Sequence, residues 1–116
     1  MEFSKFVEKA VLYDHRNIFS AYDGNLNGIP DELKEFYQKS NPVDVEVNSV
    51  RFFPAEELHD LQAEYSYLNA QFVFASCNGD PIFLQDGLVY TAPHGVEKPK
   101  WELLSSNIET YLAELL

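Results

Sequence analysis

Residues 72–91 constrain the fold more than any other segment, because they form short apolar runs separated by turn residues. The run 72–76 is apolar at odd and even positions alike, which is typical of a central strand buried on both faces. Two further runs, 82–85 and 88–91, flank an Asp-Gly pair at 86–87, the dipeptide favoured in two-residue hairpin turns. Strands joined by such short turns are antiparallel neighbours. The segment therefore predicts three adjacent antiparallel strands.

The preceding segment 43–53 predicts a strand, a turn and a second strand. Valines at 43, 45 and 47 alternate with polar residues, as in a strand with one buried and one solvated face. The apolar positions change from odd to even numbers across Asn48-Ser49. We therefore expect a turn or bulge at this dipeptide, followed by a new strand or a bent continuation over residues 50–53.

Four segments carry the apolar period of amphipathic helices. They cover, approximately, residues 3–13, 30–40, 54–68 and 101–115. Val11 belongs to the apolar face of the first helix, and Pro30 stands where helices accept an initial proline. The last predicted helix has an apolar face made of Trp101, Leu104, Ile108, Tyr111, Leu112 and Leu115.

These elements predict one α+β domain spanning residues 1–116. We expect an antiparallel, or partly mixed, twisted sheet of about four to six strands. Helices at the N-terminus, in the middle and at the C-terminus should flank this sheet.

The charge of the chain narrows the classes of partner. Nineteen acidic and eight basic side chains give a formal net charge of −11. Such a protein repels phosphate backbones and anionic lipid, so nucleic acid and membranes are not expected partners. The negative charge favours a cationic partner, but only weakly, because acidic surfaces often serve only solubility. The single Cys77 cannot form a disulfide framework, and residues 1–8 do not resemble a signal peptide, so we expect a cytoplasmic protein.

No residue pattern predicts catalysis, a cofactor or a metal site. Residues 23–28 match the first half of a calcium-binding loop, but position 12 of that loop is Lys34 where a bidentate Glu is needed. A nucleophilic pair of Cys77 and His94 would require contact and an electropositive setting, whereas Asp80 and Asp86 lie nearby in sequence. The three histidines lack the close spacing of zinc ligands.

Several ordered motifs together resemble one protein family. Residues 29–37, Ile-Pro-Asp-Glu-Leu-Lys-Glu-Phe-Tyr, are followed by an Asn-Pro pair at 41–42. Residues 72–84 read Phe-Val-Phe-Ala-Ser-Cys-Asn-Gly-Asp-Pro-Ile-Phe-Leu, and His94 and Trp101 follow. This order resembles the SUKH superfamily, the Smi/Knr family named for a yeast regulator of cell-wall glucan synthesis. The chain departs from that family where Pro42 replaces a common Gly and where a single Gly precedes Asp80.

The resemblance implies a SUKH-like domain that binds proteins and is not an enzyme. Bacterial members are interpreted as immunity proteins that bind and neutralise a cognate toxin. For this chain, the resemblance implies steric and electrostatic blocking of a toxin, such as a cationic toxin domain. A regulatory protein of the cell-wall synthesis type and a small hydrolase remain alternatives. The family's recurrent residues match Pro30, Phe74, Ala75, Gly79, Asp80 and Trp101. We expect these residues to have mostly structural roles, such as a helix start, a turn and a helix anchor. Candidate partner contacts are Asp44, Glu46, Glu57, Asp60, Asp80, Asp86 and Tyr90.

Overall fold

The computed structural model describes residues 3–116, so Met1 and Glu2 of the N-terminal stretch lie outside the described residues. Within this range the α-helices are α1 (Ser4–Tyr13), α2 (Asp31–Ser40), α3 (Leu58–Glu64) and α4 (Ile108–Leu115). Short 3₁₀ turns, η1 (Ala55–Glu57) and η2 (Ser66–Leu68), flank α3. The strands are β1 (Ile18–Ser20), β2 (Asn41–Val47), β3 (Val50–Phe52), β4 (Phe72–Cys77), β5 (Asp80–Gln85), β6 (Leu88–Thr91) and β7 (Glu102–Ser105).

The strands form one open antiparallel sheet in sequence order, β1 to β7. This confirms the α+β class, the antiparallel arrangement and the three adjacent strands of segment 72–91. The seven strands exceed the predicted number. Sequence reasoning missed β1 because it has only three residues and its pairing with β2 is irregular between Ile18 and Phe19.

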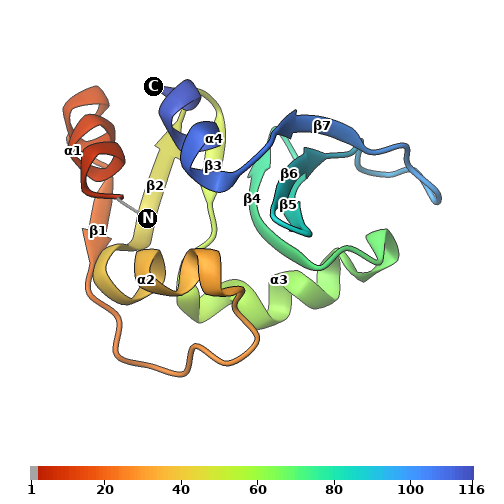
Figure 1. Cartoon of the computed structure of the whole chain (residues 1–116), viewed down its shortest axis with the longest axis horizontal. Coiled ribbons are helices and arrows are strands. Elements are labelled where there is room, and N and C mark those ends of the chain that lie inside the picture. Colours follow the sequence, from red (N-terminus) through yellow and green to blue (C-terminus); the bar gives the residue numbers. More distant parts are fainter. Residues whose placement is uncertain (1–2) are drawn as a thin grey trace.

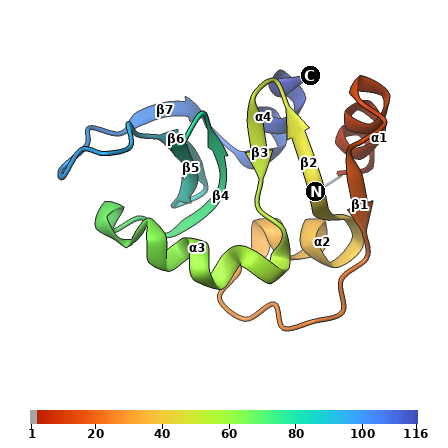
Figure 2. The same ribbon diagram turned by 180° about the vertical axis from the view of Figure 1, so that it is seen from behind.

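The helices divide the sheet into two unlike faces (Figure 1). Helices α1, α2 and α4 lie on one side, which we call the core face, and α3 lies toward the other side. Seen from behind, β2 and β3 stand in front of α4 with no helix over them (Figure 2). We call this second side the outer face.

Aromatic side chains fill the core face. The ring of Phe52 lies 5.4 Å from that of Phe6 and 6.5 Å from that of Phe36, which joins α1 and α2 to the middle of the sheet. Phe74 packs edge-on against Tyr111 of α4 at 6.1 Å. These rings are almost completely buried. Pairs of this geometry add to the stability gained by burying apolar area, so the aromatic cluster fixes where the three helices sit.

Three side-chain amides take the place of missing strand partners. Asn17 donates to the Ala10 carbonyl at 2.9 Å and accepts from the Glu46 amide at 2.9 Å, where β1 is irregular. Gln62 of α3 donates to the Val73 carbonyl at 2.6 Å and accepts from the Val73 amide at 2.8 Å. Asn41 is likewise buried and accepts from the Ala55 amide at 2.8 Å. Buried backbone groups need partners, and these amides supply them beyond the ends of the short strands.

The predicted hairpin turns are confirmed by their backbone geometry. Asp86 and Gly87 have φ of 53° and 83°, and they join β5 to β6 in two residues. Asn48-Ser49 likewise forms a turn with positive φ at both residues, so residues 50–52 are a separate strand, not a bent continuation. Positive φ at both central residues matches the right-handed twist of paired strands.

The predicted C-terminal helix is wrong in its first half. Residues 102–105 form β7, which pairs with β6, and the helix begins only at Ile108. Asn107 caps it by accepting from the Thr110 amide at 2.7 Å. The apolar spacing of Trp101 and Leu104 fits a helical period, but strand pairing and the Asn107 cap decide the structure.

One smaller expectation for the helices fails, and another shifts by one position. Val11, assigned to the buried face of the first helix, is 39% exposed because the helix contacts the sheet through Phe6 and Ala10. Pro30 precedes α2 as its N-cap residue, one position before the first helical residue. Its fixed φ still leads the chain into the helix, with the acidic first turn as expected.

Among residues 3–116, no helix has the length and apolar character needed to cross a membrane.

Candidate functional site on the outer face of the sheet

The register of the strands defines which side chains share the outer face. Cross-strand partners lie on the same side of a sheet, and alternate residues lie on opposite sides. The outer face therefore carries Ile18 and Asp44 on β1 and β2, the row Glu46, Arg51, Ser76 and Pro81 across β2 to β5, and Phe83, Tyr90 and Leu103 across β5 to β7.

An aromatic cluster occupies the β5–β7 part of the outer face. The ring of Trp101 stands edge-on to Phe83 at 4.9 Å and lies 5.5 Å from Tyr90, which stacks on Phe83 at 6.0 Å. Phe83 is fully buried, whereas Tyr90 and Trp101 are half-buried and Leu103 is 57% exposed. Tyr90 and Trp101 thus offer large, partly solvated surfaces on a rigid base.

An arginine held between a ring and a carboxylate occupies the β3 part of the same face. The Arg51 guanidinium lies 5.8 Å from the centre of the Phe53 ring and 3.1 Å from the Glu57 carboxylate. Tyr65 stacks on Phe53 at 6.3 Å and lies 6.3 Å from Tyr67, which is 41% exposed. Partial burial, followed by the negative charge of Glu64, raises the pKa of Tyr65.

The β4–β5 turn forms one rim of this face. Asp80 accepts two hydrogen bonds from His94, one from the backbone amide at 2.9 Å and one from the ring Nδ1 at 2.6 Å. These bonds lower the pKa of Asp80 below its ordinary value. A Cβ on Gly79 would lie only 3.2 Å from the His94 ring, so this close packing favours glycine. The arrangement fastens the loop after β6 to the β4–β5 turn.

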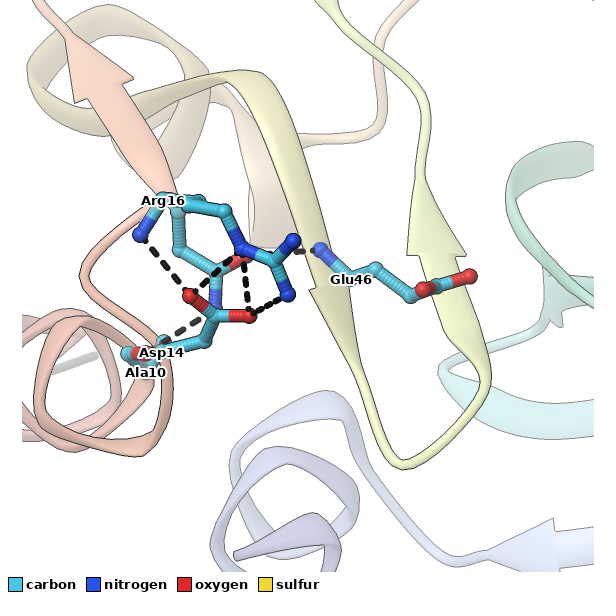
Figure 3. Close-up of polar contacts among 5 residues, drawn as sticks. Ala10, Asp14, Arg16 and Glu46 are labelled. Carbon is cyan, nitrogen blue, oxygen red and sulfur yellow. Dashed lines mark hydrogen bonds and ion pairs between the residues drawn. The ribbon is translucent and has the colours of Figure 1, made fainter.

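An acidic cluster with one arginine occupies the β1–β2 end (Figure 3). Arg16 bonds to both carboxylate oxygens of Asp14, with its nearest approach at 2.7 Å, and this holds the pKa of Asp14 at about 2. Glu46 lies beside this pair, its carboxylate pointing away toward β3. Asp14, Arg16, Asp44 and Glu46 line a polar hollow of about 380 Å³. Because Arg16 is already paired with Asp14, the exposed Asp44 and Glu46 supply negative charge at this end.

The candidate contact residues fall into three groups. Asp44, Glu46 and Tyr90 lie on the outer face, and Glu57 joins them through Arg51. Asp80 lies at the rim, bound to His94.

The remaining two candidates lie apart from that group or show no link to it. Asp86 sits in the β5–β6 turn, at the opposite end of β5 from Asp80, where it lines an open hollow with Asp31 and Glu32 of α2. Asp60 is exposed on α3. The chain therefore does not gather all seven candidates into one patch.

The motif residues mostly have structural positions. Phe74 and Ala75 are buried in β4, and Gly79 adopts φ of 92° in the turn. Trp101 was expected to anchor a helix on the sheet, and this is wrong. It precedes β7 and packs within the aromatic cluster of the outer face. Its position makes Trp101 a candidate binding residue as well.

Sequence reasoning missed Arg51, Tyr65 and Gln62. The exposed position of Arg51 between buried Val50 and Phe52 was readable as the solvated side of a strand. Nothing local in the sequence signals that Tyr65 would reach the Gly79 carbonyl, at 3.4 Å.

The side chains of the catalytic and calcium-binding alternatives make contacts other than those that these sites would need. His94 bonds to Asp80, and the Cys77 Sγ accepts a hydrogen bond from the Asn78 side-chain amide at 3.9 Å. In the 23–28 loop, Asn25 accepts from the Asn27 amide at 2.8 Å, which makes a local turn. Within residues 3–116 no group of three or more His, Cys, Asp or Glu side chains is placed to hold a metal ion.

Comparison with known proteins gives no match to the chain, whether against family models, curated proteins or solved structures.

Proposed function

We propose that this protein is a non-enzymatic binding module that recognises a cationic protein partner through the outer face of its sheet. One observation carries the proposal. The face carries the half-buried rings of Tyr90 and Trp101 at its β6–β7 end and the exposed carboxylates of Asp44 and Glu46 on β2. Tyr, Trp and Arg anchors dominate the energetics of protein interfaces, and aromatic rings and carboxylates each attract the cationic side chains of arginine and lysine.

The internal contact of Arg51 supports this choice of partner chemistry. Its guanidinium lies over the Phe53 ring and beside the Glu57 carboxylate, so the outer face already holds one guanidinium in this way. The net charge of −11 would also speed the approach of a cationic protein and make binding sensitive to salt.

Within this proposal, the narrower role is that of an immunity protein of SUKH type, which blocks a cationic toxin domain sterically and electrostatically. A regulatory interaction protein of the cell-wall synthesis type would use the same face. A large secreted toxin gene immediately beside this gene would favour the immunity role.

Affinity capture from the native host tests the proposal. The immobilised protein should retain a basic protein at about 0.05 M NaCl and release most of it at about 0.5 M, because screening at the higher concentration shortens the reach of charge. Glu46→Lys should weaken retention about tenfold or more, since a carboxylate of the interface becomes a cation.

The matched control is Glu114→Lys, the same charge change at an exposed position of α4 on the other side of the sheet. Thermal melting confirms that each variant folds. Equal retention by both variants would remove the outer face from the proposal, and retention that resists salt would remove its electrostatic part.

A further inference from the structure

A hollow of about 530 Å³ lies between the loop that joins β1 to α2 and the region of η1 and α3. We call it the α3 hollow. Figure 1 and Figure 2 both show this loop running beside the start of α3. The apolar lining of the hollow consists of the buried side chains of Ile29, Leu58 and Phe72. A cavity of this size, with apolar walls and a few polar groups, is the usual form of a small-molecule site.

The walls of the α3 hollow are held by hydrogen bonds. The Tyr22 amide donates to the Gln38 carbonyl at 3.0 Å, which ties the loop to α2. On the other wall, the buried Asn41 accepts from the Ala55 amide at 2.8 Å, which fixes the turn η1. A ligand that enters a fixed cavity loses less entropy than one that must order its site as it binds. The hollow is therefore preorganised for a ligand.

The charge of the lining selects the ligand. Glu56 is the one carboxylate of the lining, and no Lys or Arg lines the hollow. Asn41 donates to one oxygen of Glu56 at 2.8 Å and so holds the carboxylate in place. Within residues 3–116 Glu56 forms no ion pair, whereas the adjacent Glu57 is paired with Arg51. A carboxylate that is fixed but lacks a cationic partner can accept strong hydrogen bonds from a ligand cation.

The rings of the lining fit an aromatic ligand. The half-buried ring of Tyr22 lines the hollow together with the ring of Phe72. Aromatic rings pack well on one another, and their faces also attract cations. Asn25, Asn27 and His59 add polar groups at exposed positions of the lining. The ligand should therefore combine an aromatic ring with an ammonium group.

We infer that the α3 hollow binds a small aromatic amine, whose ring contacts the apolar lining and Tyr22 and whose ammonium group lies beside Glu56. The inference does not depend on the proposed function, because the lining of the hollow shares no residue with the outer face of the sheet. The net charge of −11 also favours the approach of a cationic ligand over an anionic one.

An NMR titration of the full chain tests the inference with three indole ligands that differ in charge. Tryptamine carries an ammonium group, tryptophol a hydroxyl and indole-3-acetate a carboxylate. At up to about 5 mM ligand, tryptamine should shift the backbone amide signals of Gly28 and Ala55. It should bind about tenfold more tightly than tryptophol, because hydrogen bonds between charged groups are the stronger ones. Indole-3-acetate should leave both signals unmoved.

Glu56→Gln removes the charge but keeps a side-chain oxygen for the Asn41 donor. It should abolish the roughly tenfold preference for tryptamine over tryptophol. The matched control is Glu64→Gln, the same charge change at an exposed position of α3 outside the lining, which should keep the full preference. Circular dichroism verifies the fold of both variants.

Two results would overturn the inference directly. They are equal affinities for tryptamine and tryptophol, and a preference for tryptamine that survives in Glu56→Gln. Tryptamine shifts confined to the Trp101 indole signal would also overturn it, and would instead support the outer face as the cation-binding surface. Failure of the proposed function would leave the Gly28 and Ala55 shifts in place, so the two failures can be told apart.

Discussion

Replacing Gln62 tests whether a side chain can substitute for a strand. Beyond Phe53, whose amide still donates to the Phe74 carbonyl at 3.0 Å, the chain leaves the sheet. The Gln62 side-chain amide then makes both hydrogen bonds to the Val73 backbone, at 2.6 and 2.8 Å. Val73 is 3% exposed, so water has little access to these groups in the folded protein. Gln62→Ala leaves one buried N–H and one buried C=O without partners.

The cost follows from those two groups. An unsatisfied buried polar group costs about 1–3 kcal/mol, so the loss of two partners in Gln62→Ala should lower the free energy of unfolding by about 2–6 kcal/mol. This is a large part of the roughly 5–15 kcal/mol typical of a domain. Gln62→Glu keeps an acceptor for the Val73 amide but loses the donor to the Val73 carbonyl, so about 1–3 kcal/mol should be lost.

Urea unfolding gives these free energies, and hydrogen exchange at the Val73 amide gives a local readout. The control is Gln38→Ala, at an exposed glutamine of α2, which should change stability by less than about 0.5 kcal/mol. If Gln62→Ala costs no more than Gln38→Ala, and the Val73 amide stays equally protected, the amide does not replace a strand.

Two other predictions concern single contacts. The folded pKa of Asp14, about 2, lies below its ordinary 3.8, so the stabilisation from this carboxylate is complete above pH 3.8 and is lost as pH falls toward 2. In a ¹³C carboxyl titration, Arg16→Gln should return the pKa of Asp14 toward 3.8. A pKa near 3.8 in the unaltered protein would refute the ion pair. Gly87→Ala should lower the free energy of unfolding by about 1–2 kcal/mol because of its positive φ alone, and Gly79→Ala should lower it further because the new Cβ also meets the His94 ring. Urea unfolding measures both losses. Equal losses, with an unmoved His94 ring signal, would show that the contact with His94 is unimportant.

The central sheet was predictable because its signals are local. Asp86-Gly87 adopts the turn conformation that its residue types favour, the change from odd to even apolar positions marked the turn at Asn48-Ser49, and strand register follows from short turns. The helix assigned from Trp101 failed because strands and helices both tolerate apolar spacing over one or two turns. The Asn107 cap was the local clue to the true start of α4.

The candidate site was only partly predictable. The alternation of residues 43–47 placed Asp44 and Glu46 on a solvated face, and the structure agrees. The approach of Arg51 to Phe53 and the clustering of Trp101 with Tyr90 depend on contacts between distant segments. Asp80 and Asp86 look equivalent in sequence, but the length of β5 sets them at opposite ends of the strand.

The outer face as a cation-recognising surface is the central claim, and an NMR titration with a defined probe tests it most directly. The probe is a peptide of about ten arginines at low ionic strength, compared with a glycine-serine peptide of equal length. Trp101 is the only tryptophan, so its indole N–H gives one assigned signal within the aromatic cluster. The account predicts that the arginine peptide, and not the control, shifts this signal and the amides of Glu46 and Tyr90. Shifts concentrated instead around Asp31 and Asp86, with the Trp101 indole unmoved, would contradict it.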